Sequence, residues 1–329
     1  MKKKLKQKYI ILIFGPTGVG KSGFAERLAE HVPSQLVNCD IGQFYTPFSI
    51  GTAKPDWKAS IVTQHLFDVI DEPRHFDVCQ YRKLLLETVE KIWEQHQLPI
   101  LVGGSGFYLK SLFFPPVSHD TIKKMRTEQP DTTCSLWEKL YQIDPQRALE
   151  VDKHDLYRIK RALDIWEKTG KKPSECLPVY DFPTNFLFLF LTRERKELYK
   201  RINERVFQML HEGWIEEVET LMGTRWQDFL EQKKLIGYDI IIDYIKRGKK
   251  ESEQEEMIKT IQKKTRNYAK RQITFFKSFK KQLEEAISSQ EPQAPGAILP
   301  SKIESINLTL LDCDLYIKKL LNRLNPLYE

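Results

Sequence analysis

Residues 15–22 read Gly-Pro-Thr-Gly-Val-Gly-Lys-Ser, which is the pattern G-x-x-x-x-G-K-S. An apolar run, Tyr9–Phe14, comes directly before this segment, and a helical pattern from Lys21 to His31 follows it. A buried strand, a glycine-rich loop and a helix in this order are the context in which such a loop binds phosphate. We therefore expect a P-loop at the end of a strand in an α/β sheet.

Each residue type in this loop suits a phosphate ligand. Glycines let successive backbone N–H groups point inward, and the helix N-terminus adds the positive end of its dipole. Lys21 adds a full positive charge, and the Ser22 hydroxyl can bind Mg²⁺. The expected phosphate-binding residues are Gly15, Pro16, Thr17, Gly18, Val19, Gly20, Lys21 and Ser22, with Ser22 as the metal ligand.

Three further apolar runs, Gln35–Asp40, Leu98–Gly103 and Phe186–Leu191, have the composition of buried parallel strands. Helical patterns such as Val78–Gln95 alternate with the first strands, which is typical of an α/β fold. We expect a P-loop-type parallel sheet core flanked by helices, with a helical insertion domain. The expected division is a catalytic core at 1–114 and 184–285, a helical insertion at 115–183, and a linker with a C-terminal tail at 286–329.

Helical patterns outside the strands complete this expectation. Within the insertion they cover Leu136–Gln142 and His154–Thr169, with Gly170 as a helix stop. After the fourth strand they cover Arg193–Met222, interrupted by a glycine, and Glu251–Phe279. The acidic start and basic continuation of the last pattern suit the helix dipole.

The composition excludes several classes of protein. No run approaches the roughly 18 consecutive apolar residues that a membrane span needs. Cleavage of a secretion signal would destroy the strand Tyr9–Phe14, and the five cysteines are scattered without C-x-x-C spacing, as is usual for reduced thiols. The net charge is +7. We expect a cytoplasmic, monomeric protein that does not enter a membrane.

Asp40 ends the second expected strand, at the same carboxyl edge of the sheet as the P-loop. Its carboxylate can accept a proton, bind a metal ion or simply cap the following turn. The third strand of an ATPase or GTPase, or a neighbouring strand, would end in an acid that helps to hold Mg²⁺. Here Gly103-Gly104-Ser105 follow instead, which argues against nucleotide hydrolysis.

Two basic segments indicate a polyanionic partner. Residues 259–281 contain nine Lys or Arg and no acid, and Arg266 and Lys270 share one helical face. Such a run is often only a solvated helix face, but its interleaved aromatic residues favour contact with phosphates and bases. The second cluster lies in the insertion and comprises Lys153, Arg158, Lys160, Arg161, Lys168, Lys171 and Lys172.

These motifs together resemble those of the bacterial-type tRNA dimethylallyltransferases, the tRNA isopentenyltransferases of the IPP transferase family. The I-G-T-A-K-P block at Ile50–Pro55 and the T-R-x-x-A-K-R-Q block that starts at Thr265 are the most specific. The other matching segments are Gly15–Ser22, Asp40 with Gln43 and Tyr45, His65–Asp68, Val102–Ser105, Arg158–Leu163 and Ile236–Tyr238. The resemblance runs in family order from about residue 9 to about residue 280.

The resemblance implies a specific reaction. A dimethylallyl group would pass from dimethylallyl diphosphate to N6 of adenosine 37, next to the anticodon, in tRNAs that read U-initial codons. The products would be N6-(dimethylallyl)adenosine and diphosphate. Asp40 would act as general base, and Lys21, Thr17 and Arg266 would stabilise the departing diphosphate, with Mg²⁺ on Ser22.

The resemblance also implies contacts with the anticodon stem-loop of the tRNA. The implied RNA-binding residues are Asp40, Ile41, Gly42, Gln43, Ser105, Lys123, Tyr157, Arg158, Ile159, Lys160, Arg161, Lys270, Arg271 and Gln272. Three features depart from the family pattern. Ile41 stands where Ser is usual, Ser105 stands where Thr is usual, and the segment 115–143 is short.

Two other functions stay open at the level of the sequence. An ATP-dependent small-molecule kinase would use the same P-loop but would leave both basic clusters without a role. A catalytically inert RNA-binding relative would use the clusters but not the P-loop.

Overall fold

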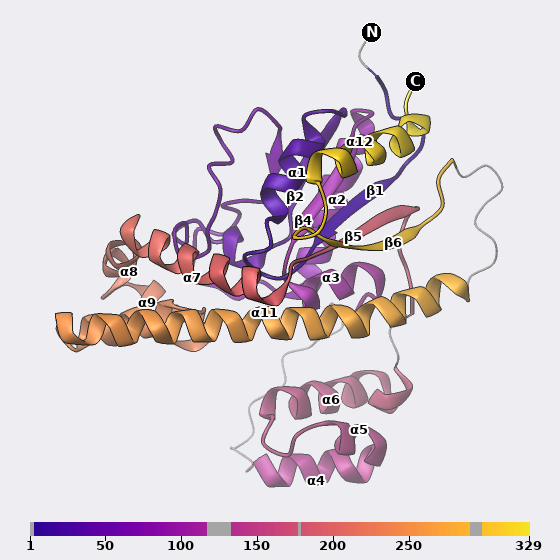
Figure 1. Cartoon of the computed structure of the whole chain (residues 1–329). Helices are drawn as coiled ribbons and strands as arrows, with labels where there is room; N and C mark the ends of the chain where they lie inside the picture. Colours follow the sequence, from indigo (N-terminus) through magenta and orange to yellow (C-terminus); the bar gives the residue numbers. More distant parts are fainter. Residues whose placement is uncertain (1–2, 117–132, 177–178, 290–297) are drawn as a thin grey trace. The chain divides into compact units, whose positions relative to one another are not determined.

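The computed structural model describes residues 3–116, 133–176, 179–289 and 298–329. The chain divides into two compact units (Figure 1). Unit 1 comprises Met1–Lys110 and Pro183–Glu329, and unit 2 comprises Ser111–Phe182.

Unit 1 is built on a parallel sheet with the strand order β3-β2-β4-β1-β5-β6. The strands are β1 (Ile10–Phe14), β2 (Ser34–Asn38), β3 (Gln64–His65), β4 (Leu98–Gly103), β5 (Phe186–Thr192) and β6 (Lys302–Asn307). The four strands expected from apolar runs are β1, β2, β4 and β5, and their observed bounds lie within two residues of the expected ones. The predicted P-loop-type α/β fold is therefore confirmed.

The central position of β1 explains its composition. All five of its residues are buried, because β4 and β5 flank it and helices cover both faces of the sheet. At its carboxyl end Phe14 is aligned with Gly103 of β4 and Phe190 of β5. The segments that follow the parallel strands therefore leave the sheet at one edge.

Helices surround this sheet (Figure 1). The helices of unit 1 are α1 (Lys21–Ala29), α2 (Val78–Glu94), α7 (Arg195–His211), α8 (Trp214–Leu221), α9 (Arg225–Lys233), α10 (Tyr238–Lys246), α11 (Glu251–Ser288) and α12 (Cys313–Leu324), and α3 (Gly106–Phe113) runs from unit 1 into unit 2. Gly213, with φ of +100°, separates α7 from α8, as the interrupted pattern predicted. The helix α11 continues for nine residues beyond the predicted end at Phe279.

The C-terminal segment differs from the expected linker and tail at 286–329. Its strand β6 pairs with β5 along the sheet, and α12 packs on the P-loop helix α1, where the rings of Phe24 and Tyr316 lie 6.2 Å apart. The two ends of the chain are also hydrogen-bonded, from Lys4 N to Glu329 O at 3.1 Å. The segment 302–329 is thus part of unit 1. Because β6 has a single buried residue, its composition did not predict a strand.

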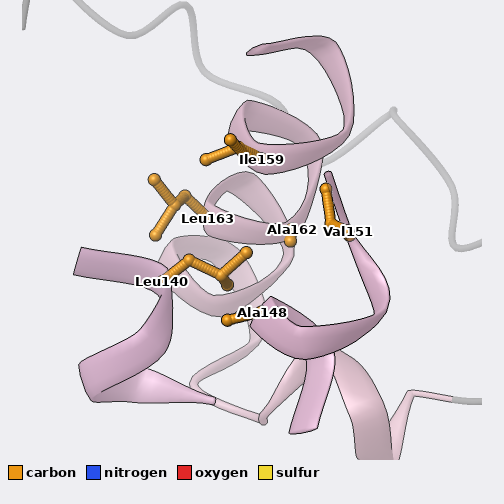
Figure 2. Close-up of a cluster of buried hydrophobic side chains, with 6 residues drawn as sticks. All are labelled: Leu140, Ala148, Val151, Ile159, Ala162 and Leu163. Atoms are coloured by element: carbon orange, nitrogen blue, oxygen red, sulfur yellow. The ribbon is translucent and has the colours of Figure 1, made fainter. Parts of the chain in front are cut away.

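Unit 2 contains α4 (Thr133–Ile143), α5 (Pro145–Glu150) and α6 (Leu156–Thr169). The two helical patterns expected in this region are α4 and α6, and Gly170 ends α6 with φ of +65°. Figure 2 shows the small apolar core between these helices. Its members are Leu140, Ala148, Val151, Ile159, Ala162 and Leu163.

Across the ranges that the structure describes, none of the helices is both long and apolar enough to cross a membrane.

The packing of α12 predicts a difference between two leucines. Leu320 is 1 % exposed and Leu315 is 52 % exposed. Leu320→Ala should lower the free energy of unfolding by about 2–5 kcal/mol, because it leaves a cavity in a packed core. The control Leu315→Ala should change it by less than about 0.5 kcal/mol. Urea unfolding followed by circular dichroism measures both, and equal effects would contradict the packing described for α12.

Candidate active site

The loop between β1 and α1 curls at its glycines. Gly18 and Gly20 have φ values of +79° and +102°, which residues with a side chain rarely adopt. A Cβ atom on Gly15 would lie 2.5 Å from the carbonyl oxygen of Leu191, at the end of β5. Glycines at these positions therefore let the loop curl tightly against the sheet.

Lys21 lies at the start of α1 and closes the loop on itself. Its Nζ atom donates hydrogen bonds to the carbonyl oxygens of Gly15 and Pro16, both at 3.1 Å. Burial lowers the pKa of Lys21 to about 8, while the Asp40 carboxylate opposes this shift and Arg205 adds to it. An anion in this site would favour the charged lysine, because it would replace the lost hydration.

Gln272, on α11, ties the P-loop to the turn after β4. Its Oε1 atom accepts a hydrogen bond from Thr17 N at 2.9 Å, and its Nε2 atom donates one to Gly104 O at 2.8 Å. Gln272 is 5 % exposed, and a Cβ on Gly104 would lie 2.6 Å from its Nε2 atom. The expected RNA contact by Gln272 is corrected here, since its amide is buried and binds two backbone groups of the protein.

Asp40 lies two residues after β2, at the start of the short helix η1 (Ile41–Phe44). Ser105 Oγ donates to Asp40 Oδ1 at 3.5 Å and accepts from Ile41 N at 3.4 Å. Although Asp40 occupies the N-cap position of η1 in the described structure, its side chain makes no capping hydrogen bond there. The capping role left open by the sequence is therefore not the one seen.

Two cavities meet at Asp40. The first, which we call the P-loop cavity, has a volume of about 430 Å³, and Lys21 and Ser22 are among its lining residues. The second, the α11 cavity, has a volume of about 340 Å³ and is lined in part by α11. Four residues line both cavities: Thr17, Asp40, Thr52 and Arg205. A group bound at the P-loop and a group bound against α11 would thus face each other across these residues.

Arginines just before α7 and within it contact the P-loop or line its cavity. Arg201 Nε donates to Gly18 O at 2.9 Å, and Arg193 Nε donates to Val19 O at 2.8 Å. Arg205 lies one turn after Arg201 and lines both cavities; its burial lowers its pKa, against the effect of Asp40. These arginines are absent from the sequence-based site, although the i, i+4 spacing of Arg201 and Arg205 is a usable signal.

Arg266, expected to stabilise the diphosphate, has a different position. Its Nη1 atom donates to Asn203 Oδ1 of α7 at 2.7 Å, and its guanidinium lies 5.9 Å from the ring centre of Tyr199. In the described structure it is not among the residues that line either cavity. The reason is helical periodicity: a step of three residues brings Thr265, Tyr268 and Arg271 to the face of α11 that lines the α11 cavity, and Arg266 points elsewhere.

Other predicted residues near Asp40 divide between the cavities and the interior. Ile41 and Gly42 line the α11 cavity, and Gln43 lines the P-loop cavity. Tyr45, which matches the family motif together with Asp40 and Gln43, is 2 % exposed and donates its hydroxyl to Arg74 O. It is therefore a core residue.

The motifs at Ile50–Pro55 and His65–Asp68 bind each other. Lys54 Nζ forms an ion pair with Asp68 Oδ1 at 2.5 Å and donates to Tyr45 O at 2.9 Å. The side chain of Lys54 is 4 % exposed, so this lysine stabilises the loop instead of offering its charge to a ligand.

Within the described part of unit 2, the predicted RNA-binding residues lie on α6. Tyr157 is 77 % exposed, and Arg158 and Lys160 are also exposed. Ile159 is fully buried in the core that Figure 2 shows, which corrects its expected contact with RNA. Arg161 is half-buried, Lys270 on α11 of unit 1 is exposed, and Lys123 lies outside the described residues.

The fold and the site define an α/β protein of the P-loop type, in which the loop cavity and a second cavity share lining residues, an acid among them. The model of the family described as "IPP transferase" matches residues 43–279. The chain belongs to this family.

Curated relatives agree with this membership. The chain is 34 % identical over 277 residues to the tRNA dimethylallyltransferase of Thermotoga maritima, covering 82 % of this chain and 90 % of that protein. It is 37 % identical over 278 residues to the protein of the same name from Geobacter sulfurreducens, with 82 % and 88 % covered.

Solved structures are similar over most of the chain. A tRNA isopentenylpyrophosphate transferase from Bacillus halodurans matches with a TM-score of 0.65 and 28 % identity, covering 98 % of this chain and 97 % of that one. A eukaryotic dimethylallyltransferase acting on tRNA matches with a TM-score of 0.73 and 25 % identity, covering 92 % and 75 %.

The buried amide of Gln272 predicts an effect on the P-loop. Gln272→Leu should lower the free energy of unfolding by about 1–3 kcal/mol, because it leaves Thr17 N and Gly104 O without their partner. It should also weaken the binding of inorganic diphosphate, measured by isothermal titration. The control Thr274→Ala changes an exposed side chain of the same helix. Equal behaviour of the two variants would contradict the bridging role.

Proposed function

We propose that this chain transfers the dimethylallyl group of dimethylallyl diphosphate to N6 of adenosine 37 in tRNAs that read U-initial codons. The products are N6-(dimethylallyl)adenosine and diphosphate. The observation that carries the proposal is the meeting of the P-loop cavity and the α11 cavity at Asp40. The names of its relatives, which state transfer to tRNA, support it.

The P-loop cavity suits the diphosphate. Lys21 and Arg205 supply positive charge, and Thr17 adds a hydroxyl at the junction of the cavities. These groups stabilise the negative charge that develops as the allylic C–O bond breaks and diphosphate leaves with the bonding electrons.

Mg²⁺ fits this site as a partner of the diphosphate. Within the described parts of the chain, no group of three or more His, Cys, Asp or Glu side chains could hold a metal by itself. The exposed Ser22 hydroxyl in the first turn of α1 would hold Mg²⁺ together with diphosphate oxygens and water, as is usual for this ion. When bound, the ion neutralises part of the diphosphate charge.

Asp40 acts as the general base. As the bond between N6 and the allylic carbon forms, the N6 proton passes to the Asp40 carboxylate. Ser105 holds this carboxylate through its hydroxyl and also accepts from the backbone of Ile41. Ser105 therefore links the carboxylate of Asp40 to the backbone of the next residue. Ile41 itself has no hydroxyl and cannot bond to this carboxylate through its side chain.

The tRNA contacts involve exposed cations and aromatic rings. Lys270 and Arg271 lie on α11, and Tyr157, Arg158 and Lys160 lie on α6. Their contacts with the anticodon stem-loop offset the few kcal/mol needed to turn the target base out of its stack. The proposal includes a monomeric enzyme in the cytoplasm.

The kinase alternative is not favoured. The family and the relatives are transferases of the isopentenyl and dimethylallyl type, and the segment after β4 carries Gly103-Gly104-Ser105 in place of an acid.

A direct assay tests the proposal and the role of Asp40. Purified protein, Mg²⁺ and dimethylallyl diphosphate should raise the mass of an unmodified anticodon stem-loop RNA by one C5H8 unit. Asp40→Asn should lower kcat by about 10²–10⁴ and leave RNA binding largely intact, because the base is lost but the contacts remain. The control is Asp71→Asn, at an exposed aspartate.

Two outcomes would contradict this assignment. RNA that binds but keeps its mass would indicate an inert relative, and tighter binding of ATP than of dimethylallyl diphosphate would indicate a kinase. Near-normal activity of Asp40→Asn would refute its role as base.

The lowered pKa of Lys21 predicts a pH dependence of binding. Lys21 is charged below its pKa of about 8 and neutral above it, so it attracts the diphosphate more strongly at low pH. The dissociation constant of dimethylallyl diphosphate should therefore rise about tenfold from about pH 7 to about pH 9, as the charged fraction falls. Burial raises the pKa of the nearby Cys39 thiol to about 12, so this group does not titrate in that range.

Isothermal titration at several pH values measures this dependence. Lys21→Met should bind more weakly and lose the dependence, whereas Lys83→Met, at an exposed lysine of α2, should keep it. A pH-independent dissociation constant in the unaltered protein would refute the prediction.

A further inference from the structure

The turn at residues 49–53 forms a wall of the candidate active site. Thr52 lines both cavities, and Gly51 and Ala53 line the α11 cavity. This turn lies outside any helix or strand, so neighbouring side chains must fix its conformation.

Glu217, on α8, holds the N–H side of this turn. Its Oε2 atom accepts from Ser49 N at 2.8 Å and from Ile50 N at 2.6 Å, and its Oε1 atom accepts from Gly51 N at 3.1 Å. Tyr238 donates its hydroxyl to the same Oε1 atom at 2.7 Å. One carboxylate thus satisfies three consecutive backbone donors, and charge makes such bonds stronger than neutral ones.

Trp214, one turn before Glu217 on α8, fixes the distance between this helix and the turn. A Cβ on Gly51 would lie 2.0 Å from its Nε1 atom, and a Cβ on Gly237 would lie 2.1 Å from its Cη2 atom. The indole is 2 % exposed. The glycines of the I-G-T and I-G-Y motifs therefore allow close approach of this ring.

Gln43 holds the carbonyl side of the turn. Its Nε2 atom donates to Thr52 O at 3.0 Å and to Ala53 O at 3.1 Å. Because Gln43 belongs to η1, which begins directly after Asp40, the turn is held against the segment of the general base. A Cβ on Gly42 would lie 3.3 Å from the Thr52 methyl group, which leaves little space between the two segments.

We propose that Glu217 is a positioning residue for the transfer reaction and that it excludes water from it. By fixing residues 49–51, Glu217 keeps Thr52 at the junction of the two cavities, beside Asp40. This inference rests on the proposed function. With Glu217 altered, the turn moves and water reaches the allylic carbon.

The resulting side reaction is hydrolysis of dimethylallyl diphosphate. The allylic C–O bond breaks and diphosphate leaves with the bonding electrons. The water oxygen bonds to the allylic carbon and releases a proton, so that the products are dimethylallyl alcohol and diphosphate. The ratio of alcohol to modified RNA therefore measures how well the turn at residues 49–53 keeps water from the allylic carbon.

Glu217→Gln tests separately whether this side chain fixes residues 49–51 and whether it excludes water. The amide nitrogen of glutamine cannot accept a hydrogen bond, so part of the contact with the turn is lost. Hydrogen exchange of the amides of residues 49–51 should become about tenfold faster or more. The ratio of alcohol to modified RNA should rise about tenfold, and kcat should fall about tenfold to a hundredfold, as expected for a displaced site. The control Glu216→Gln, at the exposed neighbour on α8, should match the unaltered protein in all three.

Tyr238→Phe provides a second, milder variant should Glu217→Gln fail to fold. It removes one donor to the carboxylate and should shift exchange and product ratio in the same direction by smaller factors. Unchanged hydrogen exchange in the variant that folds would contradict the proposal that Glu217 fixes residues 49–51. Faster exchange with an unchanged product ratio would overturn the water-excluding role. An unaltered protein that transfers nothing would refute the proposed function. The exchange measurement would still show whether Glu217 fixes residues 49–51.

Discussion

The parallel alignment of β1, β2 and β4 is the constraint on which the site depends. Parallel strands that share a register end at one edge, so the loops that follow them converge there. In this chain those loops are the P-loop, the segment of Asp40 and the turn at Gly103-Gly104-Ser105. Residues far apart in the sequence thus surround one pair of cavities.

The loops at this edge of the sheet are fixed by side chains from the second half of the chain, most of them on helices. The helix α11 binds the P-loop and the β4 turn through the amide of Gln272. Arg193, just before α7, and Arg201, on α7, bind carbonyl oxygens of the P-loop. The carboxylate of Glu217, on α8, binds the turn at 49–51. The helices around the sheet are therefore part of the site as well as of the core.

The sequence predicted most of the sheet and the glycine loop that follows β1, but not where the side chains of several motif residues lie. Central strands such as β1 and β5 are buried along their whole length, so their apolar runs are recognisable. The edge strand β6 has a single buried residue and no such run. Ile159, Gln272 and Arg266 belong to basic or family motifs, yet their side chains contact the protein itself.

Local sequence by itself determined the loop at Gly15–Ser22, the buried strands and the family to which the chain belongs, because these depend on short motifs and on runs of apolar residues. Only the tertiary structure decided which cations face the cavities, because that depends on the angle of a side chain around its helix and on what packs against it. Arg205 on α7 thus lines both cavities, while Arg266 on α11 bonds to Asn203. For the same reason the sequence did not reveal the role of Glu217, whose backbone partners lie more than 160 residues earlier in the chain.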